Sequence, residues 1–385
     1  MGRSQRHIAV VGPSAPDRGG IVQHTAELVE RLARLEPTVS LHSWQRQFPR
    51  RLAPPVGADP SPVGHVTAIG SRLLVWNRPD SWLRVGRHLA SQATDLVLVM
   101  SDPRQAPAMA AIAAAYRRGR RRRGQADDAR VRMVVHNVLP HEPSSPARLF
   151  APLALRIADR TVVHSAAQSD TARRLGAVAV VRATLPLHLG SKGGGPAAAS
   201  EMPHGRLCFI GHVREYKGLD LLIDALGRTS TRPRLEVRGV FWRPPQAFLA
   251  RAREAGVADL VELHDAFASD DELLDCIDRS DALVLPYRSA TGTQQPRLAF
   301  SRGVPVIASD VGGLAEQVNH GSDGLVFPAG DVAALARCID ELARPGVAAR
   351  LRQGIVRPDP DREWTEYLDV LLGDGEVVHE PRLRG

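Results

Sequence analysis

Cysteine is scarce in this chain, which has only three among 385 residues. Cys208, Cys276 and Cys338 form no Cys-x-x-Cys pair, and no histidine pair with zinc-ligand spacing accompanies them in the sequence. An odd number without such spacing excludes a disulfide-stapled scaffold and gives no support to a zinc site. Because each cysteine lies in an apolar stretch, we expect reduced core residues in a cytoplasmic protein.

Long hydrophobic runs are also absent. No apolar stretch reaches the roughly 18 residues typical of a membrane-spanning helix, and residues 1–7 lead directly into the strand-like run Ile-Ala-Val-Val at 8–11. We therefore expect neither an integral membrane protein nor a secreted one. Hydrophobic residues make up 43% of the chain and charged residues 24%, which is typical of a globular protein. A domain usually has about 100–200 residues, so this length predicts two domains.

Lysine is almost missing, because only Lys192 and Lys217 accompany the arginines that supply the rest of the 50 basic residues. A composition bias of the genome would explain why arginine replaces lysine at most positions. A lysine that persists under such a bias is of interest, since its compact ammonium is a point charge that the planar guanidinium of arginine does not mimic. Lys217 is therefore a candidate for a chemical role.

Much of the net charge of +8 comes from one short arginine segment. Tyr116 is the only aromatic residue beside it, and polar residues follow it, so the pattern favours a solvated helix end over a nucleic-acid-binding surface. We expect no nucleic acid partner. Peripheral contact with the anionic inner face of a membrane is the alternative that the segment leaves open. It consists of Arg117, Arg118, Arg120, Arg121, Arg122 and Arg123.

Short runs rich in valine and isoleucine alternate with helix-length segments along the chain. Runs that are apolar on both faces are typical of parallel strands covered by helices on both sides, so we predict an α/β protein with two doubly wound, Rossmann-like domains. We place the N-terminal domain at 1–189, a linker at 190–205 and the C-terminal domain at 206–358. An amphipathic helix at 361–372 should dock on another part of the chain. The expected strands are 8–11, 96–100, 133–135, 161–163, 178–181, 207–210, 235–237, 261–263, 282–285, 304–308 and 325–327.

Two strand-to-helix connections are candidate anion-binding sites. The first strand is followed by a turn with Gly19 and Gly20 at the start of a helix, where free backbone N–H groups meet the positive helix end. This turn has neither the GxGxxG nor the GK[ST] pattern, and a purely structural turn explains it equally well. The segment 209–220 is more specific. There, Arg214 and Lys217 lie three residues apart at the carboxyl end of a parallel strand, which is a natural diphosphate clamp.

A third connection follows the strand at 282–285. Pro296 suits the first turn of a helix and Gly303 suits a helix end. Thr293, Gln294 and Gln295 should therefore present N–H groups at a helix N-terminus. After the Gly19 and Gly20 turn, this is the second helix N-terminus that is predicted to bind an anion.

In their order, these motifs resemble the family-4 retaining glycosyltransferases of the GT-B fold, in the subset that lacks a pair of glutamates. The resemblance rests on the Gly-Gly turn, Arg-x-x-Lys-Gly at 214–218, Pro-Tyr-Arg-Ser-Ala-Thr at 286–291 and Gly-Val-Pro-Val-Ile-Ala-Ser-Asp-Val-Gly-Gly at 303–313, and it spans nearly the whole chain. It implies two Rossmann-like domains that face each other across a cleft. It also implies a nucleotide-sugar donor held mainly by the C-terminal domain, an acceptor held mainly by the N-terminal domain, and a final helix that crosses back to the N-terminal domain.

The resemblance assigns roles residue by residue. Gly19 and Gly20 match the loop that approaches the donor phosphates, and Arg214 and Lys217 match the diphosphate-binding pair. His136 matches a histidine at a strand end that faces the donor sugar in many members. The catalytic candidates are therefore His136, Arg214 and Lys217. The residues implied to line the donor sugar or nucleoside are Gly239, Phe267, Leu298 and Glu316.

The sequence departs from the family pattern at one place. Members commonly carry two glutamates eight positions apart, which meet the donor sugar and the ribose, and the aligned positions here hold Ala290 and Leu298. This absence leaves the donor sugar open. It also keeps two alternatives to a transferase: a catalytically inactive nucleotide-sugar-binding protein, and a sugar-nucleotide epimerase of the same fold. His164 matches a recurrent His-Ser pair, which we interpret as structural.

The resemblance implies a hexosyltransferase-type enzyme that moves a hexose or related sugar, with retention, from a nucleoside-diphosphate sugar to an acceptor hydroxyl or another nucleophile. No aspartate or histidine cluster has metal-ligand spacing, so we expect no metal and no cofactor besides the co-substrate, of UDP or GDP type. The sequence leaves two classes of acceptor open: a small molecule, such as a natural product, or a lipid-linked intermediate of the cell envelope. We place acceptor specificity in loops of the N-terminal domain, notably 44–61. The oligomeric state also stays open.

Overall fold

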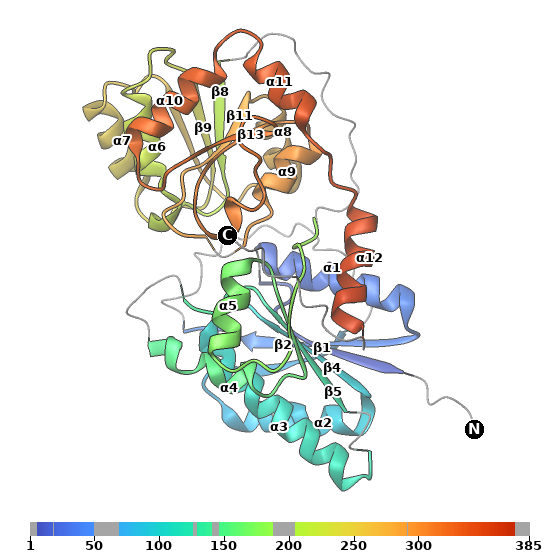
Figure 1. The fold of residues 1–385 in the computed structure, drawn as a ribbon. Helices are drawn as coiled ribbons and strands as arrows, with labels where there is room; N and C mark the ends of the chain where they lie inside the picture. Colours follow the sequence, from blue (N-terminus) through green and yellow to red (C-terminus); the bar gives the residue numbers. More distant parts are fainter. Residues whose placement is uncertain are drawn as a thin grey trace. The chain divides into compact units, whose positions relative to one another are not determined.

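The computed structural model describes residues 6–17, 19–49, 69–125, 129–140, 146–187, 205–290 and 292–373. The chain divides into two compact units, which Figure 1 shows as ribbons. Except for Gly205, the predicted linker at 190–205 lies outside the described residues. Unit 1 consists of Met1–Leu52, Pro62–His188 and Asp361–Gly385, and unit 2 consists of Ala53–Ser61 and Leu189–Pro360.

Unit 1 is built on a parallel sheet of seven strands in the order β3-β2-β1-β4-β5-β6-β7. Side chains of the central strand β4 alternate between two apolar clusters. Leu96, Leu98 and Met100 pack with the helices α2 (Pro79–Gln92) and α3 (Ala106–Arg122). Val97 and Val99 pack with α1 (Gly20–Leu35) and α12 (Pro360–Leu372). Both faces are therefore covered by helices (Figure 1), which explains the continuous apolar runs. The strands are β1 His7–Val11, β2 Thr38–Arg46, β3 Ile69–Val75, β4 Asp95–Met100, β5 Arg130–Val135, β6 Arg160–Val163 and β7 Val180–Arg182.

The sequence reasoning missed two of these strands, β2 and β3. In β2 only the middle residues are buried, and polar residues separate the apolar ones, so the segment lacks a continuous valine-rich run. Strand β3 lies at the edge of the sheet and contains Gly70 and Arg72. The prediction that 44–61 is a specificity loop is wrong at its start, because Trp44 belongs to β2 and is buried. Residues 50–61 lie outside the described residues.

The helices of unit 1 include the arginine segment. The helix α3 continues to Arg122 and has Arg123 as its C-cap, so the predicted helix end is confirmed. Its arginines differ in environment: Arg120 is buried and donates to Gln125 Oε1 at 2.9 Å, and Arg117 forms an ion pair with Asp159 at 2.5 Å. The other four arginines of the segment are exposed. The helices are α1 Gly20–Leu35, α2 Pro79–Gln92, α3 Ala106–Arg122, α4 Ala151–Leu155, α5 Ala166–Arg174 and α12 Pro360–Leu372.

The last helix, α12, is part of unit 1 although it follows unit 2 in the chain. Trp364 and Tyr367 are fully buried against α1 and the strand ends. The carboxyl end of the helix is also held, because Arg132 donates to the carbonyl of Leu372 at 3.1 Å and Arg160 donates to that of Val370 at 2.9 Å. Two guanidinium groups at a helix C-terminus complement its negative dipole end.

Unit 2 contains a parallel sheet of six strands in the order β10-β9-β8-β11-β12-β13. All six strands predicted for this part of the chain are confirmed. The predicted helix between Pro296 and Gly303 is confirmed as α9. The strands are β8 Arg206–Ile210, β9 Arg234–Gly239, β10 Val261–Asp265, β11 Ala282–Leu285, β12 Val306–Ser309 and β13 Gly324–Phe327. The helices are α6 Leu219–Leu226, α7 Pro245–Glu254, α8 Asp270–Asp278, α9 Gln295–Ser301, α10 Val332–Leu342 and α11 Val347–Gly354.

Both units are thus parallel, doubly wound α/β domains, as the sequence predicts. Within the described ranges, none of the helices has the length and apolar character needed to cross a membrane.

Candidate functional site

The strand order of unit 2 indicates where its candidate site lies. The chain goes from β8 outward to β9 and β10 on one side, and then returns to β11, β12 and β13 on the other. In a parallel sheet of this kind, a crevice opens outside the carboxyl ends of the two strands at which the order reverses. The connections that follow β8 and β11 are therefore the expected walls of a ligand site.

The backbone after β8 turns sharply at glycines that have no room for a side chain. Gly218 has a φ of 70°, and a Cβ atom there would lie 2.0 Å from the carbonyl oxygen of Pro286. At the end of β9, Gly239 has a φ of 151°, and a Cβ atom would lie 1.9 Å from the carbonyl oxygen of Gly211. Only glycine fits such conformations and such close approaches. The predicted site residue Gly239 therefore allows the β8 and β9 turns to touch.

Lys217 lies at the end of a short 3-10 helix, Glu215–Lys217, in this β8 turn. Its side chain is only 8% exposed, and no described residue forms a hydrogen bond or ion pair with its ammonium. The ammonium lies 5.3 Å from the centroid of the Tyr287 ring. Burial, with a smaller contribution from Arg214, lowers the pKa of Lys217 to about 8. A buried cation without a carboxylate partner is costly, so this arrangement favours an anionic ligand.

Arg214 supplies the second cation of the turn. Its guanidinium lies 4.0 Å from the centroid of the Trp242 ring, in a cation–π geometry. His212, in the same turn, is kept neutral because burial, Lys217 and Arg214 lower its pKa to about 4. The acidic Asp220 nearby is directed elsewhere, since it binds Arg288 through two hydrogen bonds of 2.8 and 2.6 Å. Glu215, the acidic residue of the turn itself, is exposed, so within the described residues neither Lys217 nor Arg214 has a carboxylate partner.

The turn after β11 reaches the β8 turn through the side chain of Gln295. Its Nε2 donates to the carbonyl oxygen of Ile210 at 2.8 Å, and its Oε1 accepts from the hydroxyl of Tyr287. We predicted that the N–H groups of Thr293–Gln295 bind an anion. In the structure, the N–H of Gln295 donates to Oγ1 of Thr293 at 3.3 Å, so it is used within the turn. Gln294 is the N-cap residue of α9.

The remaining site predictions for unit 2 fall at different distances from this cluster. Leu298 is buried in α9, directly after the β11 turn. Phe267 follows β10 and Glu316 follows β12, and each of these strands is two positions away from β8 in the sheet. The structure thus brings together Arg214, Lys217, Gly239 and Gln295. It adds Tyr287 and Trp242, which sequence reasoning did not select, although Tyr287 lies within the motif at 286–291.

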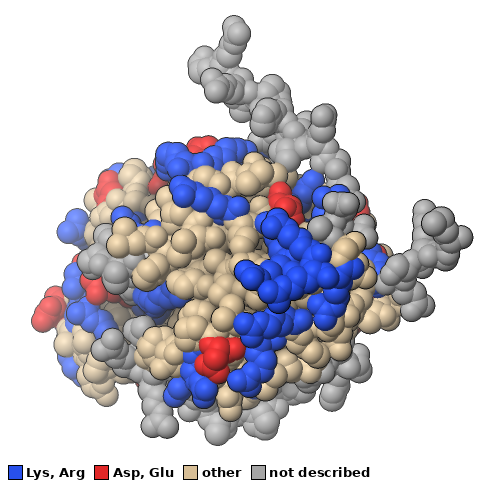
Figure 2. Space-filling model, turned by 90° about the horizontal axis from the view of Figure 1, so that it is seen from below, with Lys and Arg blue, Asp and Glu red and all other residues tan. Residues whose placement is uncertain are grey.

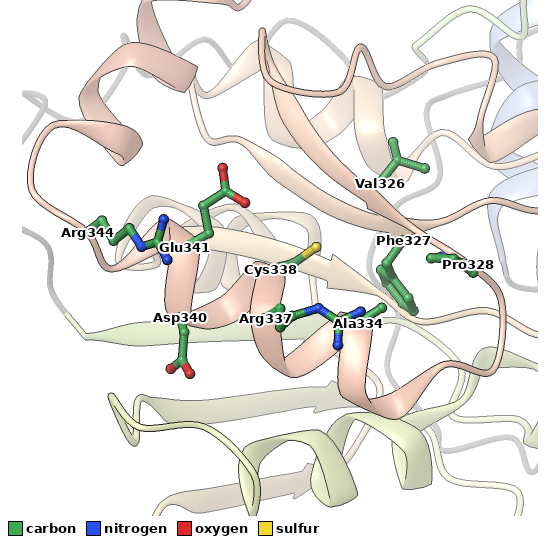
Figure 3. Close-up of a pocket in the computed structure, with 9 residues that line it drawn as sticks. All are labelled: Val326, Phe327, Pro328, Ala334, Arg337, Cys338, Asp340, Glu341 and Arg344. Carbon is green, nitrogen blue, oxygen red and sulfur yellow. The ribbon is translucent and has the colours of Figure 1, made fainter.

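Unit 2 also has a pocket of about 450 Å³ between β13 and α10, shown in Figure 3. Phe327, Cys338, Arg337 and Arg344 are among the residues that line it. Asp340 points away toward the turn after α6, where its carboxylate accepts hydrogen bonds from Ser230 and Thr231. None of the predicted site residues lines this pocket, so it does not belong to the cluster around Lys217.

In unit 1 the strand order reverses between β1 and β4, and the Gly19 and Gly20 turn follows β1. Gly19 has a φ of 116° and precedes the first residue of α1, Gly20. A Cβ atom at Gly19 would meet no atom within 4 Å, so the turn is open on that side. This agrees with a surface that a ligand could approach, and its predicted contact with donor phosphates stays a prediction.

His136, the third catalytic candidate, lies after β5 in a cluster of buried aromatic rings. Its ring centroid is 4.8 Å from that of His24 and 5.1 Å from that of His164. His24 stacks on Trp364 of α12 at 5.3 Å, and His164 stacks on Tyr367 at 6.0 Å. Burial lowers the pKa of His164 to about 4, so this ring is neutral near pH 7. His136 itself is 6% exposed, and its role in chemistry stays a prediction.

Residues 204–344 match the family described as "Glycosyl transferases group 1". The matched segment lies within unit 2 and contains both connections of the candidate site. Anabaena HepE, solved in complex with UDP, has a TM-score of 0.68 at 15% sequence identity, over 95% of this chain and 99% of that chain. Such a likeness shows the fold alone. It confirms the predicted GT-B fold with two Rossmann-like domains.

Curated relatives point to the same class of enzyme. A D-inositol 3-phosphate glycosyltransferase of Acidothermus cellulolyticus is 30% identical over 186 residues, which cover 43% of this chain and 39% of the relative. A lipopolysaccharide core biosynthesis mannosyltransferase of Rhizobium meliloti is 33% identical over 163 residues, which cover 39% of this chain and 45% of the relative. The chain thus spans less than half the length of these two relatives. Together with the matched domain, they support a transferase enzyme.

Proposed function

We propose that this protein is a glycosyltransferase that moves a sugar from a nucleoside-diphosphate sugar to an acceptor hydroxyl. The observation that carries the proposal is the pair Arg214 and Lys217, which has no carboxylate partner within the described residues, at the strand-order reversal of unit 2. A diphosphate has the charge and size that two cations three residues apart can bind. The family match to residues 204–344 covers this pair.

The same pair would act on the chemical step. When the anomeric C–O bond breaks, negative charge develops on the leaving diphosphate, and an enzyme gains most from interactions that strengthen as this charge develops. Lys217 and Arg214 would supply those interactions from fixed positions. Transfer with retention would let the acceptor attack on the leaving-group face. A phosphate oxygen could then take the acceptor proton, so that neither a carboxylate base nor a metal ion is needed.

Because the two glutamates common in the family are absent, the two alternatives, a nucleotide-sugar-binding protein and an epimerase, must be tested as well. Leu298 is buried and Ala290 has no carboxylate, so neither can bind a hydroxyl group of a sugar or ribose through its side chain. Sugar contacts in this protein would therefore come from other groups. UDP, bound in the HepE structure, is the first nucleotide to test, followed by GDP.

A panel of radiolabelled UDP- and GDP-sugars, incubated with small polyols and with lipid-linked acceptors, tests the proposal. We expect nucleoside diphosphate and a labelled product in a one-to-one ratio. Saturable binding without release of the diphosphate would instead identify a nucleotide-sugar-binding protein. Conversion of the donor in the absence of any acceptor would identify an epimerase.

We further propose that the exposed arginines of α3 hold unit 1 at an anionic membrane surface, which would suit a lipid-linked acceptor. Figure 2 shows a large group of basic side chains on the face of the molecule seen from below. Arg118, Arg121 and Arg122 are exposed on α3, which forms the lower side of unit 1 in Figure 1. Each basic residue near an anionic membrane surface contributes about 1 kcal/mol of attraction.

Replacing Arg118, Arg121 and Arg122 by glutamine should weaken binding to vesicles of phosphatidylglycerol and phosphatidylcholine by roughly 100-fold, because three such contributions are lost. Cosedimentation measures this change. Turnover of a soluble acceptor should not change, since these residues lie outside the candidate site. The matched control replaces Arg337, Arg344 and Arg350, which are exposed on unit 2, and removes the same charge. Equal losses in both variants would contradict a specific surface on α3.

A further inference from the structure

The turns that follow β8 and β11 approach each other around Lys217. A Cβ atom placed on Gly211 would lie 2.9 Å from Nε2 of Gln295 and 3.4 Å from Nζ of Lys217. The Gln295 amide and the Lys217 ammonium therefore flank the same small space above Gly211. A residue with a side chain does not fit at position 211, because Gly211 has a φ of 86° and its backbone contacts Gly239.

Gln295 links the two turns through both ends of its amide. Nε2 donates to the carbonyl of Ile210, the last residue of β8, and Oε1 accepts from the Tyr287 hydroxyl, which follows β11. The amide of a glutamine side chain can donate from its nitrogen and accept at its oxygen at the same time. Tyr287 is itself 2% exposed, and its hydroxyl finds its partners within the protein, in Gln295 and in the side chain of Thr293.

The ring of Tyr287 in turn forms one wall of the lysine site. It lies 5.3 Å from the Lys217 ammonium and 6.0 Å from the Tyr216 ring, to which it is nearly perpendicular. A tyrosine face attracts a cation, most strongly when water is excluded. The titratable and charged groups around Lys217 are Arg214, His212, Tyr216 and Tyr287, and none of them carries a carboxylate. Glu215 precedes them in the same 3-10 helix, but it is exposed and its charge acts on Arg288.

We propose that Gln295 and Tyr287 are positioning residues that hold the Lys217 ammonium in its buried place, ready for the diphosphate of the donor. The chain of contacts runs from the Ile210 carbonyl to the Gln295 amide, to the Tyr287 hydroxyl, and through the tyrosine ring to Lys217. Neither residue needs to touch the sugar. This inference deepens the proposed function and rests on it for the identity of the anion.

The scarcity of lysine provides a direct test. Lys192→Arg leaves Lys217 as the only lysine of the chain, so ε-¹³C-lysine labelling gives one side-chain signal whose NMR shift follows its protonation. In this single-lysine protein we expect a titration midpoint near 8. Gln295→Met and Tyr287→Leu should move it upward by about one unit toward the ordinary value of 10.5, because a released side chain returns to water. Tyr287→Phe keeps the ring and should move it less.

Tyr116→Phe is the matched control, since it removes a buried tyrosine hydroxyl that donates to the carbonyl of Thr94 in unit 1, outside this site. It should leave the midpoint of Lys217 unchanged. UDP affinity at pH 7, measured by calorimetry, should fall about tenfold in Gln295→Met and Tyr287→Leu and stay constant in Tyr116→Phe. An unchanged Lys217 midpoint in folded Gln295→Met and Tyr287→Leu proteins would overturn the inference.

The titration requires neither nucleotide nor turnover, so it separates the two proposals. A shifted midpoint in a protein that transfers no sugar would support the positioning network and reject the glycosyltransferase. Normal transfer with an unshifted midpoint in both variants would support the enzyme and reject the network.

Discussion

Lys217→Ala should lower kcat with any accepted nucleotide sugar by about 10²–10³-fold, which is the effect of removing one group that stabilises charge in a transition state. The structure gives the reason, because the Lys217 ammonium is buried, has no acidic partner and stands at the strand-order reversal of unit 2. Arg214→Ala should act in the same direction. Steady-state kinetics with the labelled donor measures both changes.

The chain offers a matched control for this substitution. Lys192 is the only other lysine of the sequence, in the predicted linker at 190–205, and Lys192→Ala removes the same type of side chain. Its kinetics should equal those of the unmodified protein. Lys217→Arg should recover little activity, since a planar guanidinium does not fit a site formed around a compact ammonium. Retention of near-normal kcat by both Lys217→Ala and Arg214→Ala would show that the diphosphate clamp is wrongly assigned.

The same lysine predicts a pH dependence with a definite sign. Its pKa is lowered to about 8, so kcat/KM should fall as the pH rises through about 8 and the ammonium loses its charge. Stability should move the other way. Between about pH 8 and 10.5 the unfolded chain binds more protons at this group than the folded one, so this group makes the free energy of unfolding larger as the pH rises. Lost activity in that range would therefore not reflect unfolding caused by Lys217.

The parallel strands and the position of the turn with Arg214 and Lys217 could be predicted because their signals are local. Continuous valine-rich runs mark strands buried on both faces, and the spacing of Arg214 and Lys217 can be read within one connection. The half-buried strand β2 and the edge strand β3 could not be predicted in this way, since their residues do not form such runs. Their positions depend on the neighbours that they find in the sheet.

The side-chain networks could not be predicted, because they join residues that only the fold brings together. The sequence indicates Gln295 only by its position before Pro296, whereas the structure shows that its side chain donates to the carbonyl of Ile210, 85 positions earlier. His136 was selected by resemblance to a family, and the structure places it among aromatic rings that include residues of the distant helix α12. The amphipathic pattern at 361–372 predicts a docking helix, but it does not identify the histidines that the helix covers.

Trp364→Ala should destabilise unit 1 by about 3–5 kcal/mol, the usual cost of truncating a large aromatic side chain in a core. Trp364 is completely buried, stacks on His24, and donates from Nε1 to the carbonyl of Leu187 at 3.0 Å. Truncation therefore leaves a cavity and an unpaired carbonyl beneath α12. For a domain of this size, each kcal/mol lowers Tm by roughly 2–4 °C, so scanning calorimetry should show the transition of unit 1 at a Tm roughly 10 °C lower. Trp76→Ala, which changes a 38% exposed tryptophan of the same unit, should shift Tm far less. If the two variants melted alike, α12 would not be an integral part of unit 1.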